Sequence, residues 1–409
     1  MMARQISGVC ASRVPRVCVG WAGRAARALT TLVSAAVLAA GALALVPAPA
    51  RAEDVITTQE YFSYYHLDTA RAKGYTGKGV TIALIDGPVD TSAPELKGAN
   101  ITDKSRCTIE ASSKNKGHGT DMASILVSPY FGVAPDAVLY SYQHANDNSI
   151  SAGTCRQGGQ ELDSFASLIN QAIDDGAQII SISQGGDDHS EAVKWAVARA
   201  MSTGVIIVNS AGNSGANENY NQLNHWSGVV GVSAITSDGN LASYSSWGDG
   251  VTTAAFGGPV TTHDDVDPTK LVESKGSSNS AAIVSGMLAL ARQKWPNTTA
   301  NQTLQVLVAT GLNPNHEWNQ YTGYGAANIG DLVNTDPSQY PDENPLAQKE
   351  GGSEPTAKDV QDYGDGLVDP RYVGAGESYT YRGVDPVVLD DPDIATPVHL
   401  GTSPRYHRK

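Results

Sequence analysis

Short apolar runs alternate with longer amphipathic segments along the middle of the chain. The apolar runs predict strands, and the segments with apolar residues three and four positions apart predict helices. The predicted strands are 137–142, 178–183, 204–209 and 228–234, and the predicted helices are 162–175 and 190–202. Strands that are apolar throughout and alternate with helices are typical of a parallel sheet buried on both faces. We therefore expect an α/β fold of three layers, with helices on both faces of a mostly parallel, twisted sheet.

The stretch from Gly276 to Arg292 predicts a buried helix that the chain enters through small residues. Ser278 lies in its first turn, where backbone N–H groups have no partner within the helix and can stabilise developing negative charge. Taken alone, this serine is better explained as an ordinary helix cap.

Three other polar residues change that interpretation. Asp86 ends an apolar strand, His118 opens a helical segment, and Asn213 follows another predicted strand in a glycine-containing turn. Each has a plain explanation as a turn or surface residue. The order along the chain is Asp86, His118 and then Ser278, which differs from the order His, Asp, Ser in chymotrypsin and from the order in α/β-hydrolases, where the serine comes first. Over about residues 61–332, the four segments together resemble the subtilisin-like serine peptidases, here of a secreted, actinobacterial type.

The resemblance implies acyl transfer without a cofactor. Asp86 would orient His118, His118 would take the proton of Ser278, and the Asn213 amide with the Ser278 N–H would hold the oxyanion. The same resemblance assigns substrate binding to Ser183, Gln184, Gly185, Ser210, Ala211 and Gly212. The expected function is that of a secreted serine endopeptidase acting on peptide or protein substrates.

Several departures from the family pattern keep two alternatives open. The aspartate motif reads Asp-Gly-Pro-Val-Asp over residues 86–90, as in peptide-maturing cyanobactin proteases, and Asp121 is an unusual charge beside the His118 helix. Ala282 and Ile283 replace the usual proline and histidine after the serine, and few residues remain for a folding-assisting pro-domain. The alternatives are a catalytically silent scaffold with this fold and a protease dedicated to maturing one peptide.

Residues 1–52 have the pattern of a secretory signal peptide. Five arginines precede the apolar run 29–46, and Ala50-Arg51-Ala52 gives a cleavage pattern. A membrane anchor is the competing interpretation, but the run is alanine-rich and at the short end for spanning. We therefore expect a secreted, extracellular protein without a membrane anchor, whose peptidase domain is 53–333.

The charge of the chain argues against nucleic acid as a partner. The full chain has 28 basic and 42 acidic residues, and loss of residues 1–52 removes six arginines and no acidic residue. The mature chain then carries a net charge of about −20, which would repel phosphate backbones. We expect a monomer that acts on protein or peptide.

The cysteines and histidines predict a disulfide and no metal site. Only Cys107 and Cys155 remain after removal of the signal, and an exported protein with two cysteines most simply joins them. No group of His and Cys has the spacing of metal ligands. The resemblance makes a structural calcium possible, but the loop 127–135 after the His118 helix is too short to supply the usual carbonyl ligands.

From residue 334 to 409 the composition shifts to Pro, Asp, Gly and Glu. This segment has neither strand nor helix periodicity, so we expect an acidic tail that is largely disordered.

Overall fold

The computed structural model describes residues 55–144, 155–157, 160–186, 189–218, 223–314, 317–349, 352, 354–365, 367–368 and 398–399. They all belong to one unit that begins at residue 53. The predicted signal peptide at 1–52 lies outside the described residues.

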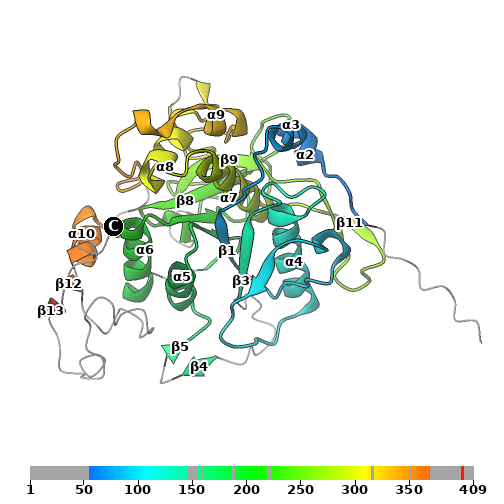
Figure 1. Ribbon diagram of the computed structural model, residues 1–409, viewed down its shortest axis with the longest axis horizontal. Coiled ribbons are helices and arrows are strands. Elements are labelled where there is room, and N and C mark those ends of the chain that lie inside the picture. Colours follow the sequence, from blue (N-terminus) through cyan, green and yellow to red (C-terminus); the bar gives the residue numbers. More distant parts are fainter. Residues whose placement is uncertain are drawn as a thin grey trace, which may run out of the picture. The chain divides into compact units, whose positions relative to one another are not determined.

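A sheet of seven parallel strands forms the middle of this unit (Figure 1). Across the sheet, the strands are β2 (Ile101–Asp103), β3 (Val138–Gln143), β1 (Thr81–Asp86), β6 (Ile179–Ile182), β7 (Ile206–Ser210), β8 (Val229–Ile235) and β9 (Val251–Phe256). The predicted strands are therefore confirmed within a residue or two at most ends, while β2 and β9 were not predicted from the sequence.

Each face of the sheet packs against its own helices, because successive strand residues point to opposite sides. In β1, Ile82 and Leu84 share a core cluster with residues of α4 (Ser113–Val127) and α7 (Ser277–Lys294). Ala83 and Ile85 share the other cluster with residues of α5 (Phe165–Asp174) and α6 (Glu191–Thr203). This is the expected three-layer α/β arrangement.

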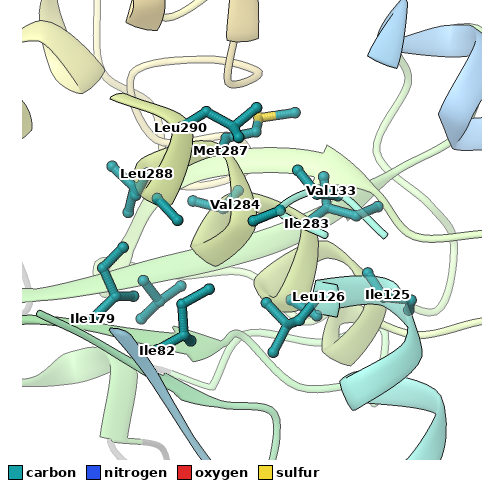
Figure 2. Close-up of a cluster of buried hydrophobic side chains, with 14 of the residues drawn as sticks. Ile82, Ile125, Leu126, Val133, Ile179, Ile283, Val284, Met287, Leu288 and Leu290 are labelled. Atoms are coloured by element: carbon teal, nitrogen blue, oxygen red, sulfur yellow. The ribbon is translucent and has the colours of Figure 1, made fainter. Parts of the chain in front are cut away.

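Helix α7 is buried almost along its whole length. Figure 2 shows Ile283, Val284 and Leu288 of α7 among side chains from the sheet and from α4. Ala282 and Ile283, which replace the proline and histidine usual in the resembled family, are both 0% exposed. The departure from the family pattern therefore falls on core packing, where apolar residues of suitable size are tolerated.

The remaining elements surround this core. They are the helices α2 (Glu60–Tyr64), α3 (Leu67–Ala72), α8 (Ala300–Ala309), α9 (Ile329–Asn334) and α10 (Ala357–Asp365), with the strand pairs β4 (Arg156–Gln157) with β5 (Gln160–Glu161), β10 (Val260–His263) with β11 (Leu271–Ser274), and β12 (Leu367–Val368) with β13 (Val398–His399). No helix in the described part of the chain combines the length and the hydropathy needed to cross a membrane.

The tail differs from our expectation that it lacks structure from residue 334 onward. Leu346 is fully buried in the main core, and α10 packs on α6 with Tyr363 buried against Ala198. Lys349 donates hydrogen bonds to the backbone carbonyls of Asn224, Val229 and Gly250. A few anchoring side chains thus fix a polar segment that has no periodicity of its own.

The loop after α4 is closed by an arginine. Arg71 of α3 donates hydrogen bonds to the carbonyls of Pro129 (2.9 Å), Tyr130 (3.0 Å) and Gly132 (2.7 Å). The guanidinium group satisfies backbone oxygens that would otherwise need a cation or water. Away from this loop, Cys107 and Cys155 are joined by a disulfide with a Cα–Cα distance of 6.0 Å, and Cys155 is buried in a small apolar cluster with Ile109 and Leu162.

Candidate active site

Asp86 and His118 meet where β1 ends beside the first turns of α4. The Asp86 carboxylate is fully buried, and its Oδ1 lies 2.7 Å from Nδ1 of His118. The same oxygen accepts the N–H of Gly87 at 2.7 Å. A Cβ on Gly87 would lie 2.0 Å from the Asn115 carbonyl oxygen, so only glycine lets the strand end approach the helix this closely.

The environment of His118 favours its charged form. Burial lowers the pKa of His118, but the charge and hydrogen bond of Asp86 outweigh burial, and Asp121 and Asp265 contribute further, so the pKa is raised above its ordinary value. Nδ1 of the His118 ring is bonded to Asp86, and no described residue bonds Nε2. Nε2 is therefore the nitrogen that can accept a proton from the nucleophile. This tautomer and orientation suit a general base.

Ser278 lies in the first turn of α7, as expected, and is 9% exposed. Its hydroxyl donates to the Ser183 carbonyl at 2.9 Å, and the Ser183 hydroxyl donates back to the Ser278 carbonyl at 3.1 Å. Among the described residues, the Ser278 hydroxyl therefore bonds Ser183 and not His118. A rotation about the Cα–Cβ bond of Ser278 is needed to direct the oxygen to a base.

Asn213 is held in place by the serine that precedes Ser278. Its Oδ1 accepts the backbone N–H of Ser277 at 2.8 Å and the Ser277 hydroxyl at 3.1 Å. This fixes the amide so that Nδ2, for which the described residues offer no acceptor, is the group left to donate. The Ser278 N–H also has no partner there, since it belongs to the first turn of α7. The two donors fit an oxyanion.

The two expected substrate segments differ in what their side chains do. Gly212 has φ 103°, and Ser210 and Ala211 are 3% and 1% exposed, so this segment offers mainly backbone. Next to Ser183 and Gly185, the side chain of Gln184 is buried, with Nε2 at 3.3 Å from both Asp86 Oδ1 and Asn115 Oδ1. The Gln184 side chain therefore supports the aspartate, and the expected binding of substrate by the 183–185 segment through its backbone stays a prediction.

Comparisons with known proteins identify the family of the chain. A sequence model of the subtilase family of peptidases matches residues 77–325, which is more than half of the chain. The chain belongs to the subtilase family. It is 29% identical over 273 residues to subtilisin DY of Bacillus licheniformis, covering 64% of the chain and 93% of that protein. It is also 30% identical over 249 residues to a thermostable alkaline protease of Halalkalibacterium halodurans, covering 59% and 65%.

This subtilase is therefore a subtilisin-like serine endopeptidase, a hydrolase of peptide or protein substrates. Solved structures share its fold. MycP1 from Mycobacterium smegmatis superposes with a TM-score of 0.56 at 23% identity over 74% of this chain and 90% of that one. The prenylagaramide maturation protease PagA gives a TM-score of 0.53 at 24% identity over 65% and 96%.

The sequence analysis missed three residues around the site. Asn115, three positions before His118 on α4, is buried and accepts from Gln184; the helical spacing could have indicated it. The carboxylate of Asp265 packs against Gly117, where a Cβ would lie 2.0 Å from Oδ1. Glu218 Oε2 lies 2.4 Å from the Cβ position of Gly212. Both acidic residues lie in loops, so no helix or strand periodicity in the sequence predicts that they lie near the site.

The described residues include no group of three or more His, Cys, Asp or Glu side chains arranged to hold a metal ion. The chemistry described above needs none, because the oxyanion donors are backbone and amide groups.

Proposed function

We propose that this subtilase is exported and cleaves peptide bonds with Ser278 as nucleophile, His118 as general base and Asp86 as the residue that orients His118. The observation that carries the proposal is the 2.7 Å contact between the buried Asp86 carboxylate and His118. Ser183, whose carbonyl accepts the Ser278 hydroxyl, is followed by Gln184, whose side chain reaches the same carboxylate. Ser278 attacks the carbonyl as His118 accepts its proton, and water later releases the acyl-enzyme. The Asn213 amide and the Ser278 N–H stabilise the oxyanion.

The adjacent serines allow a matched test with a fluorophosphonate probe, which labels only an activated serine. Labelling should disappear in Ser278→Ala. It should persist in Ser280→Ala, whose hydroxyl only bonds the Ala255 carbonyl at 2.9 Å. Ser277→Ala should be labelled more slowly, because Asn213 loses one of its two bonds to that residue. Persistent labelling of Ser278→Ala would refute the assignment of the nucleophile.

The pH profile gives a second test of the general base. The raised pKa of His118 predicts that labelling increases with pH through a midpoint above the ordinary value of 6.5, because only neutral imidazole accepts a proton. Absence of any labelling in folded wild-type protein across this range would favour the catalytically silent scaffold.

Export is supported by the amino-terminal pattern of arginines, apolar run and small residues, and by the disulfide between Cys107 and Cys155. Amino-terminal sequencing of protein recovered from culture medium should give Glu53 as the first residue. Recovery of the chain only from membranes would instead favour an uncleaved anchor.

A dedicated maturation protease is the second candidate. It is favoured by the Asp-Gly-Pro-Val-Asp motif at 86–90 and by the fold shared with a protein described as a maturation protease. Profiling with a peptide library should then give one narrow cleavage motif and weak turnover of casein. Broad cleavage of casein would favour general degradation.

A further inference from the structure

A cavity of about 300 Å³ lies beside α4 and does not include Asp86, His118 or Ser278 in its wall. One face of α4 forms one side, and the segment after β1 and the segment around β10 form the others. The β10–β11 hairpin and α4 lie side by side in Figure 1. The cavity is thus built by elements that also position the active site, but it is separate from the reacting groups.

Most charged groups at this cavity are already paired. Lys116 lies 3.2 Å from Asp90, and His263 lies 3.0 Å from the buried Glu95. Asp264 also lines the cavity, and its carboxylate accepts the backbone N–H groups of Val266 and Asp267. Two carboxyl groups of the lining remain.

Asp121 and Asp265 both line the cavity, and no described residue donates a hydrogen bond to either or forms an ion pair with either. Asp121 is partly buried in the wall of this half-open cavity, and burial raises its pKa to about 8 despite the opposing charge of His118, whereas Asp265 is exposed. Asp265 raises the pKa further, because the two like charges repel. A partly buried carboxylate without a partner, such as that of Asp121, is costly, and a bound cation would lower the cost.

Part of the remaining wall is apolar. Ile56, Ile125, Phe131 and Val260 line the cavity and are all less than 9% exposed. This combination fits an alkyl chain that ends in a cation, because the methylene groups cover apolar surface while the charged end meets a carboxylate. A bare divalent ion fits poorly, since it requires several oxygen ligands and gains nothing from an apolar wall.

We propose that this cavity binds an ammonium or guanidinium group carried on an alkyl chain, with the cation held between Asp121 and Asp265. The site is additional to the peptidase activity and does not depend on the assignment of the catalytic residues. Because Asp265 packs on Gly117 and Asp121 lies one turn after His118, a cationic occupant would stabilise the ionised form of two carboxyl groups beside the active site.

The test measures binding by calorimetry to the Ser278→Ala protein, in which turnover cannot obscure binding. The probe is n-butylguanidine, and the control ligand is n-butylurea, which has the same shape without the charge. We expect saturable binding of n-butylguanidine and at least tenfold weaker binding of n-butylurea. Asp121→Asn and Asp265→Asn should each weaken the binding of n-butylguanidine at least tenfold. Asp238→Asn, an exposed acid outside the cavity, should change it less than twofold.

Two further ligands identify the source of the cation. Binding of N-acetyl-arginine methylamide as strong as that of n-butylguanidine indicates a basic side chain of a peptide, whereas binding of n-butylguanidine alone indicates a small free base. Equal binding of the guanidine and the urea would overturn the proposal, as would binding that survives both Asp121→Asn and Asp265→Asn in protein with an unchanged circular dichroism spectrum. Binding of calcium in place of the guanidine would also overturn it.

Discussion

Replacing Asp121 by asparagine should make this subtilase more stable, and the gain should grow as the pH rises. Burial raises the pKa of the Asp121 carboxyl from 3.8 to about 8, although the charges of His118 and His263 oppose the shift. Between these two values, the folded protein holds a proton that the unfolded chain has already lost. Folding stability therefore falls as pH rises through this window, and asparagine has no proton to lose.

The magnitude follows from the width of the window. Each pH unit inside this window lowers the free energy of unfolding of the wild type by up to about 1.4 kcal/mol. The difference in the free energy of unfolding between Asp121→Asn and wild type therefore grows by at most about 4 kcal/mol between pH 5 and 9. Because Asp121 is only partly shielded from water, we expect about half of this, or about 2 kcal/mol. Such a change corresponds to an increase in Tm of about 3 °C.

The assay is thermal unfolding followed by circular dichroism at pH 5, 7 and 9. The Ser278→Ala background prevents self-cleavage during heating. Asp238→Asn serves as the control, because it makes the same charge change at an exposed turn and should leave the pH dependence of Tm unaltered. A difference between Asp121→Asn and wild type that stays constant with pH, or that shrinks toward pH 9, would refute the electrostatic reasoning.

Three other predictions concern polar side chains with unusual partners. Arg71→Met should lower the free energy of unfolding by about 3 kcal/mol, because three loop carbonyls lose their donor. EDTA should leave the wild-type Tm unchanged, since the arginine already satisfies these carbonyls, and a large fall in Tm with EDTA would contradict this. Lys349→Met should speed limited proteolysis within residues 335–365 at least tenfold, and an unchanged cleavage rate would show that the lysine does not anchor the tail. Gln184→Leu should lower kcat about tenfold with little change in KM, because the side chain supports Asp86; a change in KM alone would restore its assignment to substrate binding.

The sequence alone determined the layers of the fold and the order of the four main site residues. Apolar runs such as 178–183 bury both faces of a strand, so they can occupy only the middle of a covered sheet. Polar residues that follow such strands, including Asp86 and Asn213, then gather at one edge, because the carboxyl ends of parallel strands meet there. These inferences rest on periodicity, which is a local property of the chain.

Only the tertiary structure decided which side chains meet across that edge. Gln184 and Asp86 are 98 residues apart in sequence, and nothing local distinguishes a glutamine that supports an aspartate from one that binds substrate. The cavity beside α4 likewise combines Asp121 with Asp265 from a distant loop. The ordered tail depends on Leu346 and Lys349, two anchors in a polar segment. Contacts between residues far apart in sequence depend on how whole elements pack, so they cannot be predicted from the periodicity of the sequence.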